Sequence, residues 1–418
     1  MARPGVVALG VLCAVYAALA ILPSAPGSDI VLATAGGSPE WLLGPFRAFG
    51  ASGADGPLAG PPFYAGLWIA FGLYGFVLWR RGEVGMRAVV AVVVGLHVLF
   101  ALAPPLLSQD VFSYIAYARL GVEHDLSPYT HAPQDIPLDA VFPFAGSKDA
   151  VSVYGPAFTL ATYPLGAIGV PAAFWILKVA MALASLGVVG LVGLTAKRLG
   201  RDPLFAVLFV GLNPLTLVHV VGGAHNEALT MLIVMSGVWL WAGSRQAAGT
   251  AATVAGAGVK ASAVIVTPFL ALGSERPWRS IAAGVGVAVG LVLLAAAAYG
   301  SDALDAFGLL SSNQDRTSRF SFPHVTGELI GSIDTARALF GLAFAAVALC
   351  LMWRTWRRGA DPIRMAGWTT FAVLVASAWL VPWYALWLLP LAALAADRRL
   401  VITSLALCAW MLAIAVPL

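Results

Sequence analysis

Residues 281–299 read IAAGVGVAVGLVLLAAAAY, an apolar stretch without one charged side chain. A membrane-spanning helix needs about 20 such residues, so this stretch is of the right length to cross a bilayer. The rest of the chain is similar, because 60% of its 418 residues are hydrophobic and only 11% are charged. Soluble domains carry about 25% charged residues. The composition therefore excludes a soluble enzyme, a nucleic-acid-binding protein and a disordered chain, and it predicts an all-α polytopic membrane protein.

Apolar runs of this kind recur along the chain and predict about 13 transmembrane segments in a single integral membrane domain, 1–418. We interpret the first run as a membrane helix and not as a signal peptide, because Pro23-Ser-Ala-Pro is a poor cleavage site. The two runs on either side of Lys260 are each too short for an upright span. The runs cover 5–23, 63–79, 88–104, 172–195, 203–220, 227–243, 248–259, 261–273, 281–299, 335–353, 365–381, 384–396 and 400–416.

The distribution of charge predicts the orientation in the membrane. With a cytoplasmic N-terminus, the cytoplasmic segments hold 16 basic and 5 acidic residues, whereas the outer segments hold 6 basic and 15 acidic ones. This asymmetry follows the positive-inside rule. The outer segments 24–62, 105–171 and 300–334 are long, and the cytoplasmic connections are short. We therefore expect a multi-pass plasma-membrane protein whose active site is extracytoplasmic.

Cysteine usage and charge pattern limit the possible ligands. Cys13, Cys350 and Cys408 all fall inside apolar runs, which argues against a disulfide or a metal cluster. No Gly-rich phosphate-binding loop occurs on the cytoplasmic side. We expect no metal, no cofactor and no nucleic-acid partner.

The stretch from Ser108 to Arg119, SQDVFSYIAYAR, has the pattern of a catalytic helix in the outer segment 105–171. Asp110 falls at its predicted start, and Tyr114 and Tyr117 follow on the same face. A carboxylate beside an aromatic surface suits a sugar ring whose hydroxyl must be deprotonated. A helix-capping aspartate with two interfacial tyrosines would give the same pattern. Farther along this outer segment, the apolar residues 157–169 are too short to span and predict an interfacial helix.

Four cations are candidates for a phosphate site. Lys260 lies in a turn between two short apolar runs whose far ends are cytoplasmic, so its ammonium falls at the outer edge of the bilayer. There it can bind a lipid phosphate or snorkel to the head groups. Lys178, in the outer part of its helix, has the same two interpretations. Arg316 and Arg319 can clamp a phosphate or balance Asp315 in water.

Two further turns carry polar or aromatic groups at the outer side. His225-Asn226-Glu227 joins two apolar runs, and such groups need partners at that depth or serve as helix caps. In the stretch from Trp379 to Pro390, WLVPWYALWLLP, Trp383 and Tyr384 fit either an aromatic belt or a substrate-facing wall.

The order of these motifs resembles the polyprenol-phosphate-mannose-dependent α-(1→6)-mannosyltransferases of the GT-C superfamily. The resemblance rests on Asp-Val-x-x-Tyr with the downstream Arg119, then Pro-Tyr, Tyr154-Gly-Pro, Asn-Pro, Gly-Gly-Ala-His-Asn-Glu, Val-Lys-Ala and Pro-Trp-Tyr-x-x-Trp-x-x-Pro. It extends from Asp110 to Pro390, about two-thirds of the chain. Glu227 stands where the family pattern has Asp.

This resemblance implies a GT-C-type multi-helix fold with juxtamembrane helices in its outer loops. It further implies inverting transfer of mannose from polyprenyl-phosphate-mannose to a mannan or lipid-linked glycan acceptor, with Asp110 as general base and Lys260 as phosphate partner. Tyr114, Tyr117, Arg119, Tyr154, His225, Asn226, Glu227, Trp383 and Tyr384 would bind substrate.

Two alternatives remain open at this point. One is a GT-C enzyme that uses another polyprenyl-phosphate sugar or a phosphatidylinositol mannoside acceptor. The other is a transporter or flippase for a lipid-linked solute, against which the one-sided polar chemistry and the absence of paired broken helices argue.

Overall fold

The computed structural model describes residues 3–24, 28, 30–31, 38–49, 60–302 and 317–415, and every regular element among them is a helix. Each of the thirteen apolar runs contains a helix, so the all-α prediction is confirmed. The chain packs into two compact units. Unit 1 comprises Met1–Ser152, Phe158–Gly190 and Leu204–Leu229, and unit 2 comprises Val153–Ala157, Leu191–Pro203 and Thr230–Leu418.

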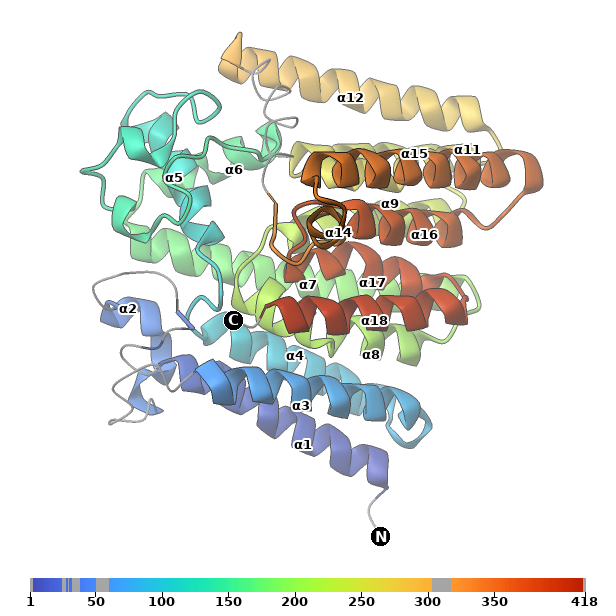
Figure 1. Cartoon of the computed structure of the whole chain (residues 1–418), viewed down its shortest axis with the longest axis horizontal. Helices are drawn as coiled ribbons and strands as arrows, with labels where there is room; N and C mark the ends of the chain where they lie inside the picture. Colours follow the sequence, from blue (N-terminus) through green and yellow to red (C-terminus); the bar gives the residue numbers. More distant parts are fainter. Residues whose placement is uncertain are drawn as a thin grey trace. The chain divides into compact units, whose positions relative to one another are not determined.

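Unit 1 is built on three apolar helices, α1, α3 and α4. Helix α1 packs against both α3 and α4 (Figure 1). Pro4 starts α1 without losing a hydrogen bond, and the Glu83 carboxylate accepts from the Gly5 N–H at 2.6 Å. The elements of unit 1 are α1 Pro4–Ile21, η1 Leu22–Ser24, α2 Glu40–Leu43, η2 Gly44–Phe49, α3 Gly60–Trp79, η4 Arg81–Glu83, α4 Met86–Leu102, α5 Asp110–Glu123, η5 Pro133–Asp135, η6 Phe142–Phe144, most of α6 Pro156–Gly166, the first part of α7 Val170–Arg198, α8 Pro203–Gly211 and η7 Leu215–Gly222.

Unit 2 contains a group of helices in which α15 packs on α16, and α16 packs on α17 (Figure 1). Asp361 and Asp397 accept hydrogen bonds from the first free N–H groups of α16 and α18. The elements are α9 Glu227–Ala242, of which all but the first turn belongs here, α10 Gln246–Ala255, η8 Gly256–Gly258, η9 Ala261–Ile265, α11 Thr267–Leu272, α12 Pro277–Tyr299, α14 Phe322–Ile330, α15 Ile333–Arg358, α16 Pro362–Ala376, η11 Pro382–Tyr384, α17 Ala385–Leu394 and α18 Arg398–Ile414.

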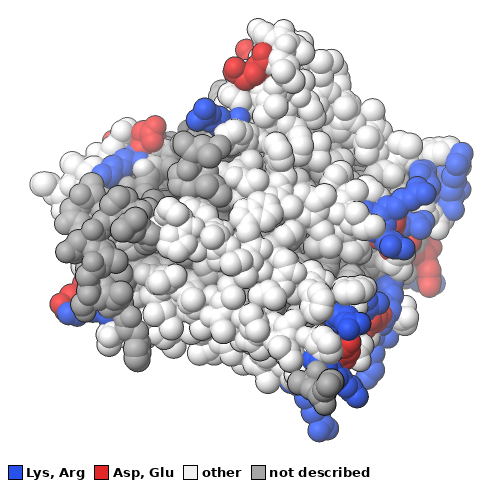
Figure 2. All heavy atoms as spheres, turned by 60° about the horizontal axis from the view of Figure 1, so that its bottom comes forward, with Lys and Arg blue, Asp and Glu red and all other residues white. Residues whose placement is uncertain are grey.

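Several helices expose apolar side chains that only a lipid environment accommodates. In the most apolar 18-residue stretch of each helix, only 6% of the residues of α12 and 11% of those of α15 are buried within the protein. Most of the described residues visible in Figure 2 are uncharged, and the Lys, Arg, Asp and Glu side chains gather in a few places. A helix that is apolar on all sides and unburied is a membrane helix. The chain is therefore a membrane protein.

The predicted count of 13 spans is not confirmed. Among the described residues, five helices are long and apolar enough to cross a membrane, and the bent pair α8 and η7 makes six. The other apolar runs form shorter helices such as α4, α9 and α16. Helix α6, Pro156–Gly166, covers most of the predicted interfacial segment 157–169. Its position in the membrane stays a prediction, as do the orientation of the chain and its single domain.

Candidate functional site

Asp110 is the first residue of α5, as the sequence predicts. The N–H of Asp110 donates to the Ser108 hydroxyl at 3.2 Å, which fixes the start of this helix. The segment before it is also anchored, because the Leu106 N–H donates to the Gly222 carbonyl at 3.1 Å. The Asp110 carboxylate thus stands on a well-defined helix start, with its side chain 35% exposed.

A buried imidazole lies beside this carboxylate. His225 Nδ1 is 3.3 Å from Asp110 Oδ2 and 3.9 Å from Glu227 Oε2, and the side chains of His225 and Glu227 are 0% exposed. We call Asp110, His225 and Glu227 the carboxylate–histidine cluster, which lies entirely in unit 1. Within the cluster only the Asp110 carboxylate reaches the surface, so it is the member that can meet a substrate.

The turn that carries His225 is shaped by a bend in the preceding helix. Pro214 follows α8, where it ends the α-helical hydrogen-bonding pattern, and η7 continues at 54° to α8 with π-helical geometry. Such π segments are frequent at functional sites. Ala224 then adopts a left-handed φ of 55°, a strained conformation for a residue with a Cβ. The fold thus holds a strained backbone next to His225.

Tyr114 and Asn226 join the two segments of the cluster. The Asn226 backbone N–H donates to the Tyr114 hydroxyl at 3.2 Å, and the Tyr114 ring is 1% exposed. Asn226 is itself fully buried. Tyr114 therefore supports the turn that carries Asn226, and its role as a substrate contact stays a prediction.

Lys178 is also buried beside the cluster. Its ammonium donates to the carbonyls of Phe100 at 3.0 Å, Pro104 at 3.1 Å and Gly222 at 2.9 Å. These three bonds use all three N–H donors of a lysine. Lys178 thus ties the end of α4 to the end of η7, and we do not retain it as a phosphate ligand.

Tyr117 and Arg119 bind groups of the protein itself. The Tyr117 hydroxyl lies 2.9 Å from the Ala150 carbonyl, to which it donates. Arg119 donates to the Asp139 carboxylate at 2.8 Å and to the Gly166 carbonyl at 2.9 Å, and His124 Nε2 lies 2.8 Å from the other Asp139 oxygen.

This network determines the ionisation of Asp139. Burial by itself raises the pKa of the Asp139 carboxyl, but the hydrogen bonds from Arg119, His124 and the Val141 N–H outweigh burial and lower the pKa below its ordinary value. Asp139 therefore stays ionised and holds α5 to the loop that follows it. Arg119 acts here as a structural partner and not as a free cation.

Lys260 forms a second candidate site, in unit 2. The helix α10 ends at Ala255, and Lys260 stands between the short helices η8 and η9, so the predicted break at this lysine is confirmed. The Lys260 ammonium lies 5.2 Å from the centre of the Tyr384 ring and 5.8 Å from that of Tyr154. Both distances are within the range of cation–π attraction. We call Lys260, Tyr154 and Tyr384 the lysine–tyrosine cluster.

Aromatic packing fixes one wall of this cluster. Tyr384 stacks on Trp387 with ring centres 4.0 Å apart, and Trp383 meets Tyr384 edge to face at 6.4 Å. The Lys260 side chain is half-buried among these rings. A half-buried ammonium binds an anion more strongly than one in bulk water, because the local dielectric is lower.

Gly155 brings the Tyr154-Gly-Pro156 motif onto the lysine turn. The Gly155 N–H donates to the Val259 carbonyl at 2.9 Å. A Cβ at this position would lie 2.4 Å from the backbone oxygens of Ala257 and Gly258. Only glycine permits this approach, which places Tyr154 beside Lys260.

Gly155→Ala is expected to displace the lysine turn and to destabilise the protein by about 1–3 kcal/mol, because backbone atoms must move. Thermal unfolding of the purified protein in detergent measures this effect. Gly286→Ala is the matched control, since a Cβ there meets nothing within 4 Å. Equal melting temperatures of the Gly155→Ala protein and the wild type would contradict the contact.

Of the two arginines in the predicted outer loop, the structure describes one. Arg316 lies outside the described residues. Arg319 is exposed, with its guanidinium 5.5 Å from the Phe320 ring centre. The neighbouring Ser318 is fixed, because its N–H donates to the Ala378 carbonyl at 2.9 Å and its hydroxyl accepts from the Leu380 N–H at 3.0 Å. Phosphate binding by either arginine stays a prediction.

Sequence reasoning missed several residues that shape these sites. Asp139 has no motif around it, and Gly155 had no assigned purpose within its motif. His219 in η7 is also buried, and neither of its ring nitrogens has a hydrogen-bond partner among the described residues. The Asn213-Pro214 pair was the available signal for the bend that positions it. In the described part of the chain, no group of three or more His, Cys, Asp or Glu residues is arranged to hold a metal.

The fold is that of a polytopic all-helical membrane protein. Its candidate site residues lie at helix ends, with Asp110 at the start of one helix and Lys260 at a break between helices. Comparison with known proteins identifies the family. The family model described as alpha-(1→6)-mannopyranosyltransferase, N-terminal domain, matches residues 58–275, and the MptB C-terminal domain matches residues 328–418. The chain belongs to the alpha-(1→6)-mannopyranosyltransferase family.

Individual relatives agree with this assignment. The chain is 30% identical over 349 residues to alpha-(1→6)-mannopyranosyltransferase A of Mycobacterium tuberculosis, covering 76% of this chain and 67% of that protein. It is 27% identical over 176 residues to the protein of the same name from Corynebacterium glutamicum, covering 40% of this chain and 35% of that protein. No solved structure matches. The chain is thus a membrane glycosyltransferase of the mannosyltransferase class.

Proposed function

We propose that the protein transfers mannose from polyprenyl-phosphate-mannose to the 6-hydroxyl of an α-mannoside on a mannan or lipid-linked glycan, with inversion at the anomeric carbon. The linkage follows the names of the relatives, and the lipid donor follows the motif resemblance. The observation that carries the proposal is the partly exposed Asp110 carboxylate, 3.3 Å from the buried His225 ring.

In the proposed reaction Asp110 acts as general base. One carboxylate oxygen accepts the proton of the acceptor hydroxyl while the hydroxyl oxygen forms a bond to the anomeric carbon. The bond from that carbon to the donor phosphate breaks, and the polyprenyl phosphate leaves with the electron pair. A β-mannosyl phosphate gives an α-mannoside in one displacement, so a second catalytic carboxylate is not needed.

His225 is proposed as a positioning residue for this base. A buried imidazole at 3.3 Å orients the carboxylate and limits its rotation, so that one oxygen stays directed to the exposed side. Glu227, fully buried on the far side of the same imidazole, would in turn hold the histidine. This second carboxylate is too buried to reach an acceptor.

Lys260 is proposed as the cation that stabilises the leaving phosphate. Negative charge increases on the phosphate as the bond to the sugar breaks, and a fixed ammonium at that point lowers the barrier. The flanking Tyr154 and Tyr384 rings hold the ammonium in place and offer apolar surface to a sugar or lipid. Trp383 extends this surface.

The donor is tested with purified protein and a short synthetic α-mannoside acceptor. We expect transfer from radiolabelled polyprenyl-phosphate-mannose without any added nucleotide sugar. Polyprenyl-phosphate-arabinofuranose serves as the competing lipid donor and nucleoside-diphosphate mannose as the soluble one. Equal or faster transfer from either competitor would overturn the donor assignment, and movement of the lipid across a vesicle without a new glycosidic bond would favour a flippase.

A further inference from the structure

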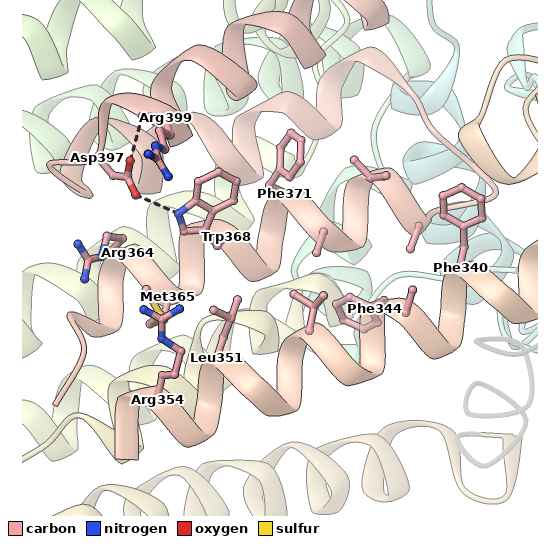
Figure 3. Close-up of a pocket in the computed structure, with 15 residues that line it drawn as sticks. Phe340, Phe344, Leu351, Arg354, Arg364, Met365, Trp368, Phe371, Asp397 and Arg399 are labelled. Carbon is pink, nitrogen blue, oxygen red and sulfur yellow. Dashed lines mark hydrogen bonds between the residues drawn. The ribbon is translucent and has the colours of Figure 1, made fainter. Parts of the chain in front are cut away.

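The C-terminal region contains an apolar groove that the proposed reaction does not use. It has a volume of about 640 Å³ and lies between α15 and α16, and its residues all fall within the segment 328–418. Phe340, Phe344 and Leu351 line it from α15, and Trp368 and Phe371 line it from α16 (Figure 3). The groove therefore offers a continuous apolar wall on two helices.

One end of this groove is cationic. Arg354, Arg364 and Arg399 line that end together with Asp397 (Figure 3). Asp397 is already engaged, because it accepts from the Trp368 indole N–H at 3.0 Å and from the Arg399 N–H at 2.9 Å. Among the described residues, none of the three guanidinium groups forms a salt bridge, and the Arg364 Nε is buried without a hydrogen-bond partner. The charge of Arg364 also acts on Asp397, so one carboxylate faces three guanidinium groups, and the end of the groove has a surplus of positive charge.

The length of the groove fits an acyl chain below a head group. Phe340 and Arg354 are 14 residues apart on one helix, which corresponds to about 21 Å at about 1.5 Å per residue. One leaflet supplies about half of a hydrocarbon core that is about 30 Å thick. An acyl chain of one leaflet therefore fits in the groove, and a few ångströms remain at the arginines for a phosphate.

We propose that this groove binds one anionic phospholipid, with an acyl chain along α15 and α16 and the phosphate at Arg354, Arg364 and Arg399. Guanidinium groups match phosphate oxygens in geometry as well as charge. The acyl chain of a phospholipid would cover the apolar wall, and its phosphate would bind the cationic end. A soluble anion would leave the apolar wall uncovered. The charge pattern of the sequence assigns these arginines to the cytoplasmic side, where anionic lipids attract basic residues.

Native mass spectrometry of the full-length protein in detergent tests the proposal, with palmitoyl-oleoyl phosphatidylglycerol and palmitoyl-oleoyl phosphatidylcholine as probes. We expect one phosphatidylglycerol to bind at least about tenfold more tightly than phosphatidylcholine. The triple variant Arg354→Gln, Arg364→Gln, Arg399→Gln should lose at least about tenfold in affinity, as expected for charge-assisted hydrogen bonds. The control variant Arg357→Gln, Arg358→Gln, Arg398→Gln removes the same number of charges from the ends of α15 and α18, outside the groove. It should bind phosphatidylglycerol within threefold of wild type.

The apolar part has its own control. Ala372 lines the groove and Ala346 is exposed on α15 away from it, so Ala372→Trp should weaken phosphatidylglycerol binding while Ala346→Trp should not. Each variant is used only if its melting temperature and its size-exclusion elution volume equal those of the wild type, which shows that it is folded. The proposal would be overturned by equal binding of the two head groups or by equal losses in the two triple variants. It would also be overturned if dihexanoyl phosphatidylglycerol, whose acyl chains are short, bound as tightly as the long-chain lipid.

Discussion

Asp110→Asn is expected to reduce mannosyl transfer at least about 100-fold while leaving donor binding intact. Asparagine keeps the shape of the side chain but cannot accept the acceptor proton, and general base assistance is typically worth about 10²–10⁴-fold. The α5 start should persist, since the Ser108 hydroxyl that accepts from the N–H of residue 110 is unchanged. Initial rates with saturating donor and acceptor, measured on purified protein, give this ratio.

Glu123→Gln is the matched control for Asp110→Asn. Glu123 is the last residue of the same helix and is exposed, so its neutralisation removes one carboxylate without touching the carboxylate–histidine cluster. Its rate should stay within about twofold of wild type. If the Asp110→Asn enzyme also transfers within a few-fold of wild type, Asp110 serves only the start of its helix. Asp110→Glu should likewise recover little activity, because the longer side chain misplaces the oxygen.

Lys260→Ala is expected to lower the catalytic efficiency toward the lipid donor by roughly 10- to 150-fold. This range corresponds to the loss of one charge-assisted contact, about 1.5–3 kcal/mol. The effect should be confined to the donor, so the KM for the acceptor stays near its wild-type value. Lys260→Arg keeps the charge between Tyr154 and Tyr384 but changes its shape, and it should restore only part of the efficiency.

Lys148→Ala provides the control for Lys260→Ala. Lys148 is an exposed lysine whose ammonium also faces an aromatic ring, at 4.4 Å from the centre of Phe142. A general effect of losing a lysine–aromatic pair would lower donor efficiency in both variants. A folded Lys260→Ala protein with unchanged donor dependence would show that Lys260 only snorkels to the head groups.

Local features of the sites could be predicted from the sequence because local signals determine them. The apolar run 88–104 and the polar residues after it predicted a helix starting at Asp110, and α5 starts there. The two short apolar runs on either side of Lys260 predicted a turn at this lysine, and the structure has a break there. Hydropathy likewise located a helix in every apolar run, since burial in lipid acts on each run by itself.

Contacts between distant segments could not be predicted in this way. Asn226 and Tyr114 are 112 residues apart, and no periodicity connects the turn of His225 with α5. The same limit applies to Tyr114 and Lys178, which the sequence offered as a substrate contact and a phosphate ligand. In the structure their hydrogen bonds go to other segments of the chain. Whether a polar side chain faces a substrate or a backbone carbonyl depends on the neighbouring helices. The span count is not confirmed for a related reason, since an apolar run that forms a short or bent helix is still apolar.

The stereochemistry of the product tests the central claim most directly. Purified protein is given polyprenyl β-mannosyl phosphate and a short α-mannoside, and the one-bond carbon–proton coupling at the new anomeric centre is measured by NMR. A single inverting displacement assisted by Asp110 predicts a new α-(1→6) linkage only. A product with the β configuration would require retention, hence a second nucleophile, and would contradict the mechanism proposed for this chain.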